Sequence, residues 1–193
     1  MSNMMADPGA NSEAEIVSIL IADDHPLVRQ ALRTLLESQS DFKILGEASD
    51  GEEAVRLAVE LRPDIVIMDI TMPKKNGLIA TREIKERCPE IKILVLTVHS
   101  DNEHIFGILD AGAAGYLTKS VFGKEVLSAI RSVIAGDSVL SSHVLKQIVK
   151  TVFQQPEKTV DLNYSGVLTS RELDILRLAA KGMSNKDIAQ KLN

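Results

Sequence analysis

The chain has 193 residues, of which 45% are hydrophobic and 25% charged, as in a globular protein with one full core and a smaller second unit. Its net charge of −5 argues against a protein whose whole surface coats nucleic acid. No run of about 18 apolar residues is present, so we expect neither a membrane span nor a membrane partner.

The N-terminal residues and the single cysteine indicate where the protein works. Residues 1–15 are rich in Ser, Asn, Gly and Ala and lack the apolar core of a signal peptide, which predicts a disordered extension. Cys88 has no partner for an internal disulfide, and nothing around it suggests a metal site. Both features favour a reduced, cytoplasmic protein.

Strand-like and helix-like patterns alternate five times between residues 16 and 137. Short apolar runs, typical of strands buried on both faces, lie at residues 17–22, 42–48, 63–69, 91–98 and 116–118. Apolar residues at helical spacing follow each run, within residues 26–36, 51–61, 78–84, 102–110 and 126–134. The alternation predicts an α/β fold: a five-stranded parallel sheet, doubly wound with helices on both faces. The periodicity leaves the order of the strands open.

Four of the five expected strands end in a polar side chain. Asp23 and Asp24 follow the first strand, Asp69 ends the third, Thr97 lies near the end of the fourth, and Lys119 ends the fifth. A single aspartate in such a position is a solvated loop residue in roughly a third of cases. The carboxyl ends of parallel strands share one edge of a sheet, so these side chains should converge. Their convergence favours a functional site over a set of unrelated loop residues.

Three carboxylates gathered this closely remain ionised only with a cation among them. Each close pair costs about 4 kcal/mol at a separation of about 4 Å in an effective dielectric near 20. Hard oxygen ligands select Mg²⁺, with Mn²⁺ as an alternative. A carboxylate beside Mg²⁺ can attack phosphorus, and Lys119 and Thr97 can then contact the new phosphoryl oxygens. Since no strong general base is evident, we expect acceptance of one phosphoryl group rather than enzymatic turnover.

These residues, together with Met72-Pro73 and Asn76-Gly77 in the following loop, resemble the receiver domain of two-component response regulators. The resemblance covers about residues 16–137. It implies a flavodoxin-like strand order of 2-1-3-4-5. It also implies that a sensor histidine kinase donates the phosphoryl group and that Asp69 is the phosphoacceptor.

The same resemblance implies roles for the remaining site residues. Mg²⁺ would be held by Asp24, Asp69 and the main-chain carbonyl of Thr71, with Asp23 acting through water. Thr97 and Tyr116 would form a switch in which the hydroxyl moves toward the phosphoryl group and the ring turns inward. From the residues alone, half-buried packing of Tyr116 beside Gly115 remains an equally good interpretation.

The rest of the chain predicts a second, smaller unit. Residues 138–166 read as an amphipathic helix (139–153) and a polar linker. In residues 167–193, the segments 168–172 and 182–189 resemble the LuxR-type helix-turn-helix of the NarL/FixJ subfamily. Thr169 and Glu172 fit a capping box at the start of its first helix.

The recognition helix of that family would follow Asn193, so we expect residues 167–193 to be a truncated domain. A recognition helix reads base edges, whereas phosphate contacts alone do not specify sequence. Specific DNA binding is therefore expected only from an intact helix-turn-helix domain. Nanomolar, sequence-selective binding in a gel shift would contradict this expectation.

Three functions remain open at this stage. The favoured one is a response regulator in which phosphorylation of Asp69 drives a change of conformation and homodimerisation that controls transcription. A Mg²⁺-dependent aspartyl-phosphate phosphohydrolase is the enzymatic alternative, although such enzymes usually carry a second acid where this chain has Thr71. A phosphorylation-independent dimerisation module acting through helix 124–135 is the third.

Overall fold

A six-stranded parallel sheet forms the centre of the protein. The computed structural model describes residues 16–98, 102–121, 123–153, 178 and 191. The strands are β1 (Val17–Ala22), β2 (Phe42–Ala48), β3 (Ile65–Met68), β4 (Lys92–Thr97), β5 (Gly115–Thr118) and β6 (Val139–Leu140). They are ordered β2-β1-β3-β4-β5-β6, and every pairing is parallel. The expected order of the first five strands is confirmed.

The predicted count of five strands is wrong, because a sixth strand lies beside β5. Val139 and Leu140 pair with Gly115 and Tyr116, whereas the sequence pattern assigned them to a helix. The amide of Val139 donates to the carbonyl of Ala114 over 3.2 Å. Two residues are too few to produce a period of two in the sequence, so this strand is set by its hydrogen bonds to β5.

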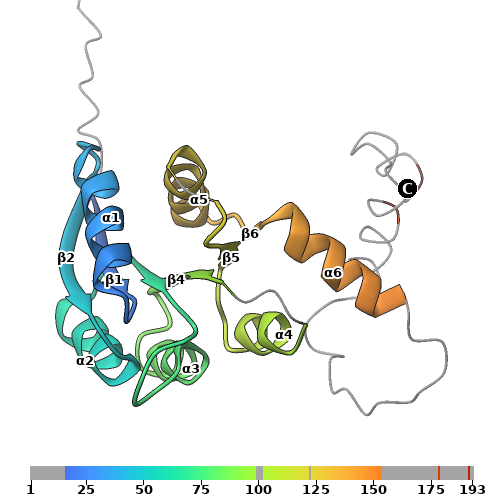
Figure 1. Cartoon of the computed structure of the whole chain (residues 1–193), viewed down its shortest axis with the longest axis horizontal. Helices are drawn as coiled ribbons and strands as arrows, with labels where there is room; N and C mark the ends of the chain where they lie inside the picture. Colours follow the sequence, from blue (N-terminus) through green and yellow to red (C-terminus); the bar gives the residue numbers. More distant parts are fainter. Residues whose placement is uncertain (1–15, 99–101, 122, 154–177, 179–190, 192–193) are drawn as a thin grey trace, which may run out of the picture.

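Helices cover both faces of the sheet, as expected (Figure 1). One face carries α1 (Pro26–Glu37) and α5 (Lys124–Ile134). The other carries α2 (Gly51–Leu61), α3 (Gly77–Arg87), α4 (Asn102–Asp110) and α6 (Ser142–Phe153). Ser141 precedes α6, and its hydroxyl accepts a hydrogen bond from the amide of Val144.

The alternation of side chains along β3 divides the core into two hydrophobic clusters. Ile65 and Ile67 pack with residues of α1 and α5, while Val66 and Met68 pack with residues of α2, α3 and α4. All four side chains are buried, as expected for the central strand of a sheet covered on both faces. The strand that leads to Asp69 is therefore fixed by packing on both sides.

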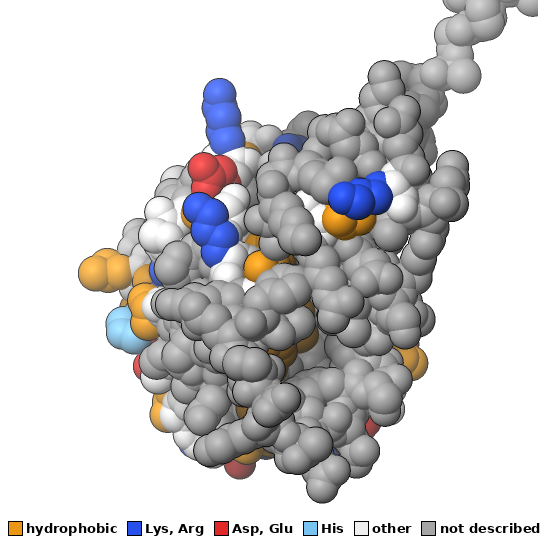
Figure 2. All heavy atoms as spheres, turned by 90° about the vertical axis from the view of Figure 1, so that its right-hand side faces the viewer, with side chains coloured by type: hydrophobic (Ala, Val, Ile, Leu, Met, Phe, Trp, Pro, Cys, Tyr) orange, Lys and Arg blue, Asp and Glu red, His pale blue; other side chains and the backbone are white. Residues whose placement is uncertain are grey.

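The second unit lies mostly outside the described residues. This applies to the expected extension at residues 1–15, to the linker at 154–165 and to most of residues 167–193. Leu178, one of the two described residues in this part of the chain, is buried. Among the described side chains on the α6 side of the molecule, hydrophobic, basic and acidic groups are interspersed (Figure 2). None of the helices in the described ranges is long and apolar enough to cross a membrane.

Candidate functional site

The carboxyl edge of the sheet brings three of the expected site residues into direct contact. Asp23 follows β1, Asp69 follows β3, and Lys119 follows β5. Each is held by a main-chain hydrogen bond from its own amide to a neighbouring strand. The acceptors are the carbonyl groups of Ala48 (3.1 Å), Ala22 (2.8 Å) and Thr97 (2.7 Å), respectively. The sheet therefore fixes the main-chain position of each of these three residues.

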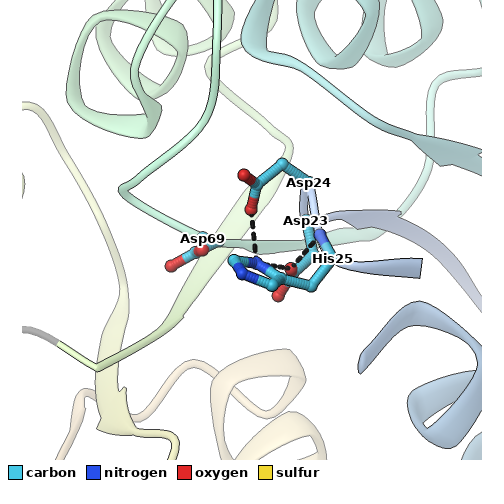
Figure 3. A group of neighbouring side chains, drawn as sticks. All are labelled: Asp23, Asp24, His25 and Asp69. Atoms are coloured by element: carbon cyan, nitrogen blue, oxygen red, sulfur yellow. Dashed lines mark hydrogen bonds and ion pairs between the residues drawn. The ribbon is translucent and has the colours of Figure 1, made fainter. Parts of the chain in front are cut away.

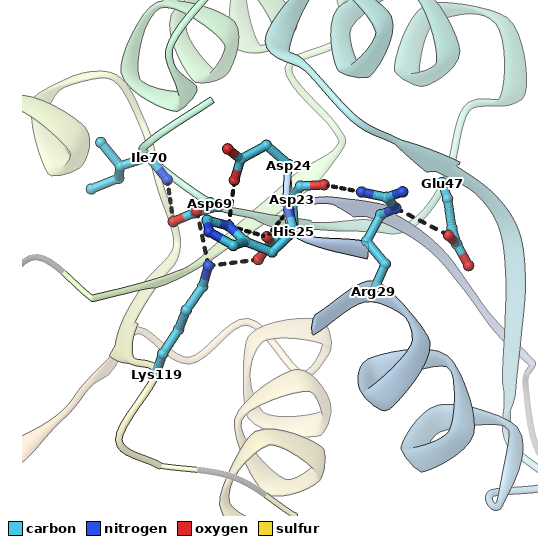
Figure 4. A network of polar contacts seen from close by, with 8 residues as sticks. All are labelled: Asp23, Asp24, His25, Arg29, Glu47, Asp69, Ile70 and Lys119. Atoms are coloured by element: carbon cyan, nitrogen blue, oxygen red, sulfur yellow. Dashed lines mark hydrogen bonds and ion pairs between the residues drawn. The ribbon is translucent and has the colours of Figure 1, made fainter. Parts of the chain in front are cut away.

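Lys119 bridges two buried carboxylates. Its Nζ lies 2.7 Å from Asp23 Oδ2 and 2.9 Å from Asp69 Oδ2 (Figure 4). Burial alone would lower the pKa of Lys119, but hydrogen bonds from its ammonium group to both aspartates hold that pKa above its ordinary value. The positive charge of Lys119 therefore partly compensates the negative charges of Asp23 and Asp69, which are each 2% exposed.

Asp24 and His25 complete a cluster of groups that could ligate a metal ion. Asp23, Asp24, His25 and Asp69 each offer one such atom, and these atoms all lie within 4.8 Å of one another (Figure 3). His25 Nδ1 lies 2.6 Å from Asp24 Oδ1, a close contact that lacks the geometry of a hydrogen bond. Sequence reasoning gave His25 no role, although its position directly after two strand-end aspartates was a usable signal.

The donor atoms fit a small divalent cation. Mg²⁺ binds oxygen at about 2.1 Å, so ligands on opposite sides of the ion lie about 4.2 Å apart, close to the span of this cluster. Asp24 Oδ1 is buried and accepts no hydrogen bond from the described residues, and its near neighbour is His25 Nδ1, another group that could ligate the ion. The three carboxylates favour Mg²⁺ or Mn²⁺, both of which prefer oxygen ligands.

The loop after β3 wraps tightly around Asp69. The amide of Ile70 donates to Asp69 Oδ1 over 2.8 Å, and the amide of Gly77 donates to the carbonyl of Ile70 over 2.8 Å. A Cβ atom on Gly77 would lie 2.0 Å from the carbonyl oxygen of Asp69, so only glycine fits there. Thr71 is exposed and lies in this loop, two residues beyond Asp69.

Thr97 and Tyr116 lie on β4 and β5, between the acidic cluster and the edge strand β6. Thr97 pairs in register with Thr118, the residue before Lys119. The ring of Tyr116 is fully buried rather than half-buried, and it belongs to the same cluster as residues of α4 and α6. The structure therefore has this ring in an inward position.

A doubly wound parallel sheet with an acidic cluster and a lysine at its carboxyl edge is the arrangement expected of a signalling receiver domain. Residues 19–131 match the family described as "Response regulator receiver domain". Residues 166–193 match the family described as "Bacterial regulatory proteins, luxR family". The chain belongs to the two-component response regulators of the LuxR type.

Several known proteins resemble most of the chain. The transcriptional regulatory protein LiaR of Bacillus subtilis (strain 168) is 39% identical over 177 residues, which are 92% of this chain and 82% of LiaR. A LuxR-family response regulator from Aurantimonas sp. SI85-9A1 has a TM-score of 0.68 at 36% identity, covering 72% of this chain and 99% of that structure.

A third relative is known in complex with DNA. The structure of two RcsB dimers bound to two parallel DNAs matches with a TM-score of 0.67 at 25% identity. The match covers 93% of this chain and 84% of RcsB. The similarity therefore extends beyond the receiver domain into the C-terminal part of the chain.

Proposed function

We propose that this response regulator accepts one phosphoryl group on Asp69 from a sensor histidine kinase. The observation that carries the proposal is the Lys119 ammonium group, which lies within 2.9 Å of carboxylate oxygens of both Asp23 and Asp69. In this proposal Asp69 is the nucleophile, the acidic cluster binds the cation, and Lys119 supplies a positive charge for the phosphoryl oxygens. A carboxylate oxygen of Asp69 would form the new bond to phosphorus as the bond from phosphorus to the donor breaks.

Mg²⁺ would neutralise charge on the transferred group and on the acidic cluster. In this proposal Asp24, Asp69 and the main-chain carbonyl of Thr71 hold the ion, and Asp23 contributes through a water molecule. The short span of the donor atoms supports this arrangement. Mn²⁺ has the same preference for oxygen ligands and could replace Mg²⁺.

Phosphorylation would act on transcription through Thr97 and Tyr116. The Thr97 hydroxyl would bind a phosphoryl oxygen, which would favour the inward position of the Tyr116 ring over an outward one. The resulting shift would promote homodimerisation, and the segment that matches the luxR family would act on DNA as part of an intact helix-turn-helix domain. The structure of RcsB dimers bound to DNA supports, by analogy, the last step, in which a dimer binds DNA.

The test is the mass of the intact chain after incubation with Mg²⁺ and a small phosphodonor. The wild type should gain one phosphoryl group, and Asp69→Asn should gain none. Asp64→Asn is a matched control, because Asp64 is an aspartate at the opposite edge of the sheet that hydrogen bonds Ser18. Labelling of Asp69→Asn at the wild-type level would refute the proposal. Sustained phosphate release from a small ester would favour the phosphohydrolase instead.

A further inference from the structure

Asp23 is fixed by its main chain as well as by its carboxylate. Its amide donates to the carbonyl of Ala48 on β2 over 3.1 Å. Its carbonyl, at a residue that is 2% exposed, accepts a hydrogen bond from Arg29 Nη1 on α1 over 2.7 Å (Figure 4). Because β1 ends at Ala22, this carbonyl accepts no main-chain hydrogen bond from the part of the chain that the structure describes, and a buried carbonyl needs a donor. Arg29 supplies that donor.

Arg29 is itself held in place from β2. Its Nε donates to Glu47 Oε2 over 3.2 Å, and its side chain is only 17% exposed. Glu47 precedes Ala48, the residue that accepts the Asp23 amide. The amide and the carbonyl of Asp23 therefore both depend on the end of β2, one directly and the other through Arg29.

A second arginine shares the same carboxylate but does not contact Asp23. Arg33, one turn further along α1, donates from Nε to Glu47 Oε1 over 2.6 Å and from Nη1 to Glu37 over 2.8 Å. The two arginines thus make the same kind of ion pair with Glu47. They differ because Arg29 also donates to the carbonyl of Asp23, whereas Arg33 donates to Glu37 instead. Comparing variants of the two arginines can therefore distinguish an effect on the acidic cluster from an effect on stability.

We propose that Arg29 is a positioning residue, which with Glu47 orients the Asp23–Asp24 peptide so that its carboxylates bind a divalent cation. Losing the Arg29 contact would free the Asp23 carbonyl and allow the peptide to rotate, which would move both carboxylates. Groups that orient metal ligands typically change metal affinity about 10- to 100-fold when they are removed. The inference rests on the proposed function, since it concerns the same cation site.

The experiment compares Mn²⁺ binding by the wild-type chain with binding by Arg29→Ala, Arg29→Lys and Arg33→Ala. Loss of the electron paramagnetic resonance signal of free Mn²⁺ measures the affinity, and urea unfolding without metal measures the stability. We expect Arg29→Ala to weaken Mn²⁺ binding at least about tenfold. Arg33→Ala should bind within about twofold of the wild type while losing a similar amount of stability.

Arg29→Lys provides a conservative variant if Arg29→Ala does not fold. A single ammonium group can reach the Asp23 carbonyl or Glu47 but cannot span both as a guanidinium does, so we expect partial rescue of affinity. Equal loss of affinity in Arg29→Ala and Arg33→Ala, or wild-type affinity in both Arg29 variants, would overturn the inference. Failure of the wild type to bind Mn²⁺ or to accept a phosphoryl group would instead overturn the proposed function.

Discussion

Replacing Asp24 by asparagine should stabilise the metal-free chain and abolish most of its response to Mg²⁺. Lys119 is shared by Asp23 and Asp69, whereas Asp24 contacts His25 and has a buried oxygen without a hydrogen bond. Two carboxylates at the 4.8 Å span of the cluster repel each other by about 3.5 kcal/mol in an effective dielectric near 20. Since Lys119 offsets part of this repulsion, we expect a net gain of about 1–2 kcal/mol.

Urea unfolding at pH 8 measures the effect. In EDTA, Asp24→Asn should unfold at higher urea than the wild type, with an unchanged dependence of free energy on urea. In millimolar Mg²⁺ the wild type should gain stability as the ion binds the folded state, and the variant should gain much less. Stability and metal binding are thus expected to change in opposite directions.

Asp64→Asn tests whether the gain comes from like-charge repulsion. The Asp64 carboxylate accepts hydrogen bonds from the amide of Ser18 over 2.7 Å and from its hydroxyl over 2.5 Å. Because hydrogen bonds rather than repulsion dominate around Asp64, this variant should lose about 1 kcal/mol in either buffer. An Asp24→Asn chain less stable than the wild type in EDTA would refute the reasoning.

Three further predictions, two of them with a control substitution, concern the loop after β3 and the packing of α6. Gly77→Ala should cost about 2–3 kcal/mol in urea unfolding, because its Cβ would lie 2.0 Å from the Asp69 carbonyl oxygen. Gly107→Ala, whose nearest neighbour is a flexible Leu78 atom at 3.4 Å, should be neutral or stabilising. The pKa of the Asp50 carboxyl lies below its ordinary 3.8 because Lys74 donates to it over 2.6 Å and the amide of Glu53 caps it. Asp50→Asn keeps the cap but loses the negative charge that pairs with Lys74. The variant should be about 0.5–1 kcal/mol less stable than the wild type above pH 4, and this difference in stability should disappear as pH falls through the lowered pKa of Asp50. Ile148→Ala should cost about 2–4 kcal/mol because Ile148 is 6% exposed, whereas Leu145→Ala, at 37% exposure, should cost under about 1 kcal/mol.

Periodicity predicted the first five strands and the helices between them but missed the two-residue strand β6. The strand at 42–48 and the helix at 102–110 have the expected bounds, because each carries enough apolar residues to define its period. β6 was missed for the opposite reason. Its two residues are held to β5 by main-chain hydrogen bonds, and these leave no pattern of side chains in the sequence.

The same distinction explains which site residues could be found. Asp69 and Lys119 stand out because a charged residue at the end of an apolar run is conspicuous, and the parallel sheet brings such ends together. Arg29 looks like any basic residue on the polar side of a helix. Its contact is a main-chain carbonyl, whose need for a donor becomes apparent only once the end of β1 is located in space.

Tyr116 on β5 is hydrogen bonded to the residue before α6 and shares a hydrophobic cluster with that helix. Its carbonyl accepts a hydrogen bond from the amide of Ser141, which directly precedes α6, and its buried ring belongs to the same hydrophobic cluster as Val144 and Ile148. An outward turn of the ring would leave a cavity beside this cluster, and close-packed interiors tolerate cavities poorly. The position of the ring and the packing of α6 are therefore energetically coupled. α6 precedes the segment that matches the luxR family, so in the proposed function this packing would connect the position of the ring to that segment.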